Sequence, residues 1–278
     1  EILRSAVYQL KFMDSVPDSA VCNEAVKLAQ RKGFYNLKPF VNGVLRTIAR
    51  EIGDLELPSR EENEVRYLSV KYSMPEYLVE KWKAAYGVKT TEKILEDFLT
   101  ERPITVRCRT HKASLREIVT SLKSQGVTVE QAPYLPYALK ISDYNHILTL
   151  ETFIQGKILV QDVSSMLVAE AASPKKGDHI IDMCAAPGGK SIHAADKMGD
   201  YGNVDARDVS QYKADLIKEN IHRTGVINVE ARVQDATVYD PDSEQAADIV
   251  IADVPCSGYG VIGKKPIHLQ DRDAKAKD

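Results

Sequence analysis

The chain has few cysteines, no long hydrophobic run and no excess of positive charge. Its 278 residues include 4 cysteines outside any CxxC or metal-ligand spacing, which favours reduced thiols in a cytosol and predicts no metal site. No apolar stretch approaches the roughly 18 residues of a membrane span, and no secretory signal is apparent. A net charge of −3 gives no overall basic field, so any nucleic-acid surface would be a local patch. We expect a cytoplasmic, monomeric protein without membrane association, made of one or two ordinary globular domains.

A glycine-containing turn is the first of two segments that suggest chemistry. An apolar run ends at Asp182, and Met-Cys-Ala-Ala-Pro-Gly-Gly-Lys190 then leads into a helical pattern from Ser191. Such a turn between strand and helix lets a nucleotide-like ligand approach the backbone, because glycine has no Cβ. A phosphate-binding P-loop needs a glycine where Cys184 stands, and the dinucleotide pattern G-x-G-x-x-G is absent. A purely structural turn is the remaining alternative for this segment taken alone.

Acidic residues stand at the predicted ends of successive strands. Asp208 follows the turn by about 20 residues, where open α/β sheets bind a ribose; the competing Asp205 lies inside its strand. Asp235 ends the next strand and is suited to accept a hydrogen bond from an adenine amine. Ligands of open α/β sheets bind at the strand tips, so Asp182, Asp208, Asp235 and Asp253 together predict a ligand site at one edge.

The second segment is Asp253-Val-Pro-Cys-Ser-Gly-Tyr-Gly260, in which an acid, a proline and a thiol follow an apolar run. A buried, inert thiol is the alternative reading of Cys256. Taken together, the two segments resemble the RNA cytosine-5 methyltransferases that use S-adenosylmethionine (SAM), most specifically over residues 158–266. The resemblance implies that SAM is bound by the turn and the strand-end acids, namely Cys184, Ala185, Ala186, Pro187, Gly188, Gly189, Lys190, Asp208, Asp235 and Asp253.

The same resemblance implies covalent catalysis involving Asp253 and Cys256. Carbon 5 of cytosine is a poor nucleophile, and addition of a thiolate at carbon 6 makes it enamine-like. RNA enzymes of this family take the attacking thiol from a later Thr-Cys motif and use the Pro-Cys thiol to release product. No Thr-Cys pair occurs in this sequence. We therefore expect a fragment truncated at both ends, whose own activity is open; Cys256 attacking by itself, as in DNA cytosine methyltransferases, is the alternative.

The amino-terminal part has helical periodicity and resembles a known RNA-binding fold. Residues 17–29 and 40–46 are similar to the closing half of the NusB-type domain, which is fused to the front of one bacterial branch, the RsmB/Sun-like enzymes of the small ribosomal subunit. The resemblance therefore predicts a partial NusB-like domain over 1–60. It implies ribosomal RNA, and within that 16S RNA, as the partner.

The middle of the chain predicts a strand, a helix and two further strands between 104 and 142. This order suits the ferredoxin-like module that the family places before its catalytic sheet. We assign 61–157 to linker helices with that module and 158–278 to an α/β, Rossmann-like methyltransferase sheet lacking its last strands, so the fold class is multidomain. One local cluster of cationic side chains suits contact with RNA phosphate, and a solvated loop is the alternative; it consists of Arg107, Arg109, His111 and Lys112. An aromatic-rich helical segment suits core packing better than base stacking; it contains Tyr72, Tyr77, Trp82 and Tyr86.

The sequence thus predicts SAM-dependent methylation of carbon 5 of a cytosine in ribosomal RNA. A non-catalytic RNA-binding protein that uses the helical front domain is one alternative. A SAM-dependent enzyme with a non-RNA substrate is another, but N-methylating relatives carry Asn/Asp-Pro-Pro-aromatic where this chain has Asp253-Val-Pro-Cys256.

Overall fold

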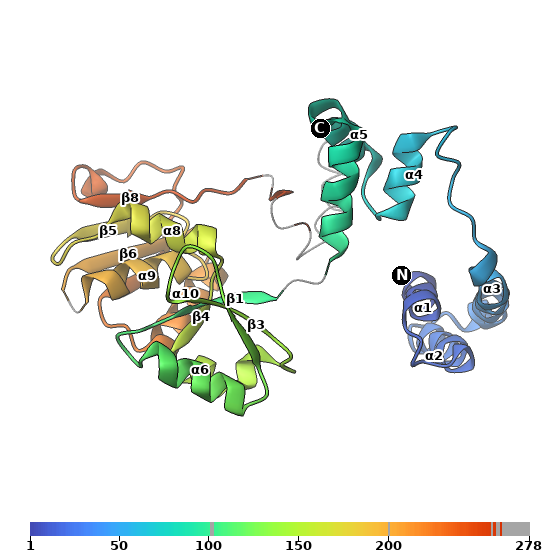
Figure 1. The fold of residues 1–278 in the computed structure, drawn as a ribbon, viewed down its shortest axis with the longest axis horizontal. Helices are drawn as coiled ribbons and strands as arrows, with labels where there is room; N and C mark the ends of the chain where they lie inside the picture. The colour runs from blue at the N-terminus through green and yellow to red at the C-terminus, as the bar shows by residue number, and fades with distance from the viewer. Residues whose placement is uncertain (101–102, 200, 257, 260–261, 263–278) are drawn as a thin grey trace. The chain divides into compact units, whose positions relative to one another are not determined.

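The computed structural model describes residues 1–262 except 101–102, 200, 257 and 260–261. The described chain divides after Leu99 into two compact units (Figure 1), and each is treated by itself. None of the helices in the described part combines the length and the apolar character needed to span a bilayer. Asp253-Val-Pro-Cys256 lies within the described residues, whereas Ser257 and Gly260 of the second sequence segment lie outside them.

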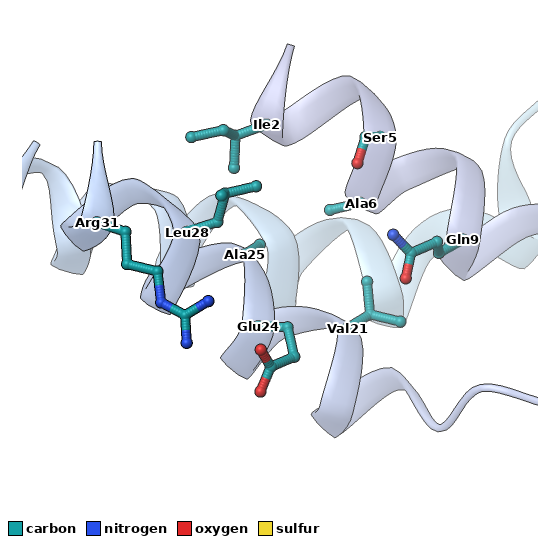
Figure 2. A pocket seen from close by; sticks show the side chains of 9 residues that line it. All are labelled: Ile2, Ser5, Ala6, Gln9, Val21, Glu24, Ala25, Leu28 and Arg31. Carbon is teal, nitrogen blue, oxygen red and sulfur yellow. The ribbon is translucent and has the colours of Figure 1, made fainter.

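The first unit is helical, as the periodicity predicts. Small and branched apolar side chains from three amphipathic helices meet in one core, which includes Ala6, Val21 and Leu45. A hollow of about 170 Å³ lies between the first two helices, lined by residues such as Ala6, Ala25 and Leu28 (Figure 2). The helices are α1 (Ile2–Phe12), α2 (Asp18–Arg31), α3 (Lys38–Glu51), α4 (Glu64–Lys71) and α5 (Glu76–Leu99), with 3₁₀ turns at Tyr35–Leu37 and Ile52–Asp54.

The aromatic residues of α4 and α5 serve mainly in packing. Tyr72 and Trp82 are only 7% and 9% exposed, and the Trp82 ring lies 5.7 Å from that of Phe98. Tyr86 is exposed, and it stands directly before a break at Gly87, whose φ of 74° is outside the helical region. The sequence-based preference for a packed helix face over a stacking platform is therefore confirmed for Tyr72 and Trp82.

The second unit begins with an antiparallel sheet in the order β2-β3-β1-β4. One face is covered by a helix that starts with a capping box, in which Ser114 and Glu117 satisfy each other's backbone N–H groups. This is the predicted ferredoxin-like arrangement of strand, helix and two strands, which is followed by a further strand. The elements are β1 (Ile104–Cys108), α6 (Leu115–Ser124), β2 (Thr128–Gln131), β3 (Ala138–Ser142), a 3₁₀ turn (Ile147–Thr149), α7 (Glu151–Ile154) and β4 (Ile158–Val160).

A parallel sheet in the order β7-β6-β5-β8 follows, as expected for the Rossmann-like part. Helices α9 and α10 cover one face (Figure 1), where Ala194 and Ile217 pack on Ile180 and Val204. The element order confirms the predicted fold class of helical bundle, ferredoxin-like module and α/β sheet. The elements are α8 (Val163–Ala172), β5 (His179–Asp182), α9 (Gly189–Met198), β6 (Asn203–Asp208), α10 (Gln211–Thr224), β7 (Val229–Val233), a 3₁₀ turn (Pro241–Ser243) and β8 (Ile249–Ile251).

The strand at Ile158–Val160 joins the first sheet, because Val106 pairs with Val160 and Cys108 with Ile158. The sequence analysis had assigned this stretch to the start of the catalytic part. The compact units also separate between α5 and β1 rather than near residue 60. The three-part division at residues 60 and 157 stays a prediction.

Candidate cofactor and catalytic site

The turn after β5 is fixed by backbone hydrogen bonds from both neighbouring strands. Met183 N–H donates to the Ile251 carbonyl of β8 at 2.9 Å, and Ala185 N–H donates to the Arg207 carbonyl of β6 at 2.8 Å. The Ala186–Pro187 peptide bond is cis. The turn, which we call the cofactor loop (residues 183–190), therefore lies across the carboxyl ends of the parallel strands, where ligands of open α/β sheets bind.

The two glycines of the cofactor loop differ in the space around them. Gly188 has φ of 99°, and a Cβ there would lie 3.2 Å from Cγ2 of Ile217 on α10. Any side chain at Gly188 would thus be strained and crowded. Around Gly189, a Cβ would meet only the side-chain carbon of Gln161, at 3.9 Å. A Cβ at Gly189, where helix α9 begins, would therefore fit in ordinary van der Waals contact.

Asp208 ends β6 and ties this strand to the cofactor loop. Its carboxylate accepts hydrogen bonds from the N–H groups of Ala186 at 3.0 Å and Val209 at 2.8 Å. It also forms an ion pair with Lys213 at 3.0 Å. Burial opposes ionisation, but the Lys213 side chain and the two N–H groups prevail and lower the pKa of Asp208. The carboxylate is therefore charged at neutral pH, next to the loop.

Asp182 lies fully buried beneath the loop. Its Oδ2 accepts a hydrogen bond from the Ser191 hydroxyl at 2.7 Å, whereas its Oδ1 has no hydrogen-bond partner in the structure. Burial raises the pKa of Asp182 to about 6, although the Ser191 hydroxyl, Lys190 and the backbone N–H of Cys184 favour the charged form. The sequence grouped Asp182 with the strand-end acids without a specific role, because an orphaned buried oxygen is visible only in three dimensions.

Lys190 and Asp253 connect the two segments that the sequence analysis singled out. The ammonium of Lys190 donates to Oδ2 of Asp253 at 2.6 Å, across 63 positions of the chain. Cys256 follows three residues later and is exposed, and its sulfur accepts a hydrogen bond from Gly258 N–H at 3.4 Å. The structure thus brings the end of the cofactor loop next to Asp253, and it leaves the Cys256 thiol open to solvent.

Asp235 belongs to a cavity beside the loop rather than to the loop itself. Its carboxylate accepts hydrogen bonds from the backbone and the hydroxyl of Thr237, and the backbone bond is the main reason that its pKa is lowered. Asp235 and Met183 line the same cavity, of about 210 Å³, with Gln234 and Arg207. The four strand-end acids therefore lie at one edge of the parallel sheet. Asp235 lines the same cavity as Met183 of the cofactor loop.

Asp205, the alternative to Asp208, has a structural environment of its own. It is 3% exposed and pairs with Arg207 and Arg232 in an ion cluster. The choice of Asp208 over Asp205 for a position near the turn follows from this geometry, because only Asp208 bonds to the cofactor loop.

The predicted cationic cluster is wrong for Arg107 and Arg109, because both side chains are buried. Arg107 and Arg109 are 2% and 1% exposed, and both bind Asp196 of α9, at 2.7 and 2.6 Å. They hold the two sheets of this unit together and do not offer guanidinium groups to RNA phosphate. His111 and Lys112 are exposed, and His111 Nε2 lies 3.5 Å from the same Asp196. Asp196 lies 87 positions from Arg109 in the chain, so the burial of this arginine has no local signal in the sequence.

Three protein-family models match the chain, each over a different part. Residues 1–50 match the NusB family, 74–147 match the ferredoxin-like domain of RsmF/B-type methyltransferases, and 169–276 match the 16S rRNA methyltransferase RsmB/F model. The order of these matches is that of the helical bundle, the antiparallel sheet and the parallel sheet.

Individual relatives agree with these matches. The probable ribosomal RNA small subunit methyltransferase B of Bacillus subtilis is 38% identical over 269 residues, which are 96% of this chain and 59% of that protein. The 28S rRNA (cytosine(4447)-C(5))-methyltransferase of Homo sapiens is 30% identical over 75% of this chain and 26% of its own length. The crystal structure of PH0851 has a TM-score of 0.85 at 30% identity, covering 98% of this chain and 60% of that one. The chain thus spans about 60% of the Bacillus subtilis relative and of PH0851 and 26% of the human relative, and along its length it is similar to the RsmB/F family of rRNA methyltransferases.

Proposed function

We propose that this chain forms part of a SAM-dependent enzyme that methylates carbon 5 of a cytosine in ribosomal RNA, and specifically in 16S RNA. The observation that carries the proposal is the meeting of the two sequence segments, because the Lys190–Asp253 pair joins the cofactor loop to the segment that carries the exposed Cys256. The relatives' names supply the substrate class: small subunit ribosomal RNA in Bacillus subtilis and cytosine carbon 5 in Homo sapiens.

The residues at the strand ends fit SAM as the methyl donor. Its ribose hydroxyls need an acceptor such as the charged Asp208, which ends β6 beside the cofactor loop. The cavity of about 210 Å³ beside Asp235 suits the adenine, because it lies at the carboxyl ends of the parallel strands. When bound, SAM supplies an electrophilic methyl group.

The remaining chemistry concerns the cytosine ring and this chain's own groups. A cysteine thiolate adds to carbon 6, and the electron pair displaced onto the ring makes carbon 5 nucleophilic. We assign Asp253, which lies 2.6 Å from the Lys190 ammonium, to the cytosine ring nitrogen, where a proton shared within this pair can be donated as the negative charge develops. After methylation, carbon 5 loses its proton and the thiolate leaves carbon 6. We assign Cys256 to this release step, with a second thiol as the attacking group.

RNA contacts are assigned to the modules before the parallel sheet. The NusB-type match over 1–50 and the ferredoxin-like match over 74–147 support RNA as the partner. A ribosomal RNA substrate would place the enzyme in the cytoplasm. The burial of Arg107 and Arg109 removes one proposed phosphate contact, so the RNA surface has to be sought elsewhere on these modules.

The decisive experiment uses the full-length protein, because this chain spans 59% of the Bacillus subtilis relative. We expect a Cys256→Ala variant, incubated with SAM and unmethylated 16S RNA, to accumulate a covalent protein–RNA adduct on a denaturing gel, since attack proceeds while release stalls. A Cys22→Ala variant, which alters a buried cysteine of the helical bundle, is the matched control and should form no lasting adduct.

Two other outcomes would change the proposal. If Cys256→Ala forms no adduct and loses all turnover, Cys256 itself is the nucleophile. If the wild-type protein binds RNA but neither binds SAM nor transfers a methyl group, the chain belongs to a non-catalytic RNA-binding protein.

A further inference from the structure

The carboxyl-terminal end of α10 connects the ferredoxin-like module to the cofactor loop. Arg223 donates from Nη1 to the Phe153 carbonyl at 2.8 Å, and from Nη2 to Oδ1 of Asn220 at 2.8 Å. Asn220 in turn donates from Nδ2 to the Pro187 carbonyl, in the middle of the cofactor loop, at 3.0 Å. These contacts form an unbroken chain of hydrogen bonds from a backbone atom of one module to a backbone atom of the loop.

The module end of this chain is held rigidly. The guanidinium of Arg223 lies over the Phe153 ring at 3.9 Å and also reaches the Ile158 carbonyl at 3.3 Å. Gly156 lies so close to α10 that a Cβ would be 2.5 Å from the Arg223 carbonyl oxygen. The module and the end of α10 are therefore in direct backbone contact, which leaves Arg223 little freedom.

A second arginine makes the reciprocal connection. Arg109, which directly follows β1, donates to the Thr224 carbonyl at the end of α10 at 2.5 Å and to Asp196 of α9 at 2.6 Å. One buried guanidinium thus holds both helices whose amino-terminal ends border the candidate SAM site. Asp196 is about 10 Å along α9 from Gly189, at 1.5 Å per residue.

We propose that Arg223 and Asn220 are positioning residues, through which the docked ferredoxin-like module holds the cofactor loop in its SAM-binding geometry. This inference rests on the proposed function for the identity of the ligand. Neither residue touches the reacting atoms. Asn220 is the nearer member, because its amide contacts the Pro187 carbonyl directly, and Arg223 acts through Asn220.

The test is calorimetric titration of the full chain with SAM, using three variants. Asn220→Ala removes the contact with the loop and should raise the Kd by about fivefold to tenfold, the usual range for one lost hydrogen bond. Arg223→Lys keeps the charge, but lysine lacks the planar guanidinium that bonds Phe153 and Asn220 at the same time. This variant should therefore also raise the Kd. Glu219→Ala, an exposed neighbour on α10, is the matched control and should leave the Kd unchanged.

Binding stoichiometry separates positioning from a merely structural role. A variant that only unfolds part of the sample binds fewer SAM molecules with the wild-type Kd, whereas loss of positioning keeps the stoichiometry and raises the Kd. The double variant Asn220→Ala/Arg223→Lys should be no weaker than Asn220→Ala, because the two residues act in series. Strictly additive effects would contradict the relay.

Hydrogen exchange tests the relay without any ligand. Amides of residues 183–190 should exchange faster in Asn220→Ala and Arg223→Lys than in Glu219→Ala. Unchanged exchange together with unchanged Kd would overturn the inference. If the wild-type chain does not bind SAM at all, the proposed function fails, and the exchange rates still decide whether the relay holds the loop.

Discussion

The two charged regions of the second unit differ in how their charges are satisfied. At the junction of the two sheets, Asp196 is almost wholly buried and binds the buried guanidinium groups of Arg107 and Arg109. At the carboxyl edge of the parallel sheet, Asp253 pairs with Lys190 and its side chain is 60% exposed. The buried charges at the junction hold elements of the fold together, whereas the exposed carboxylate at the strand end is accessible to a ligand.

The largest expected effect concerns the buried junction. Replacing Asp196 with alanine leaves two buried guanidinium groups without their carboxylate, so the free energy of unfolding should fall by about 3–5 kcal/mol. Urea denaturation of the full chain measures this. An equal loss in the control Asp215→Ala, which removes an exposed aspartate of α10, would mean that burial is not the cause.

The second prediction concerns Asp182 and has a defined pH dependence. Because its folded pKa is raised to about 6 from 3.8, the folded state holds this proton longer than the unfolded chain does. Its contribution therefore favours folding below pH 4 and becomes less favourable as the pH rises to about 6. An Asp182→Asn variant can still accept from Ser191, and it should lack this decline, which amounts to about 3 kcal/mol. Urea denaturation between pH 4.5 and 7 measures it; identical slopes in both proteins would contradict the prediction.

The smallest effect on stability is expected for the ion pair between Lys190 and Asp253. A Lys190→Met variant keeps most of the side-chain length and loses the contact with Asp253, whose side chain is 60% exposed. Exposed pairs contribute less than about 1 kcal/mol, so the melting temperature should change little. Calorimetric melting of this variant beside Asp196→Ala sharpens the comparison. A loss of stability as large as that of Asp196→Ala would remove the distinction between the two regions.

The same contrast explains what could be predicted from the sequence. The positions of Asp208 and the cofactor loop could be predicted from the local sequence. The topology of a parallel sheet puts a glycine turn after one strand and an acid at the end of the next strand at the same edge. The element order of the ferredoxin-like module was equally readable from its periodicity. Arg107 and Arg109 stand beside exposed cations in the sequence, and only the packing of α9 against β1 reveals that they are buried.

The Arg223–Asn220 relay lay beyond the sequence for a related reason. Both residues are ordinary polar positions near the end of a helix, and such residues usually face solvent. Their partners, Phe153 and Pro187, lie 70 and 33 positions earlier in the chain, and the bonds go to carbonyl oxygens that carry no sequence signal. Hydrogen bonds from side chain to backbone at such separations depend on the docking of whole elements.

The most direct measurement is calorimetric titration of SAM into the full chain and into its Asp208→Ala variant. The account predicts one site in the wild-type protein and a loss of about 1.5–3 kcal/mol in the variant, which is a factor of about 10 to 150 in Kd, because a charge-assisted hydrogen bond disappears. Asp215→Ala, an exposed aspartate on α10, should bind like the wild type. No binding to the wild-type chain, or equal affinity in the Asp208→Ala variant, would contradict a SAM site at these strand ends.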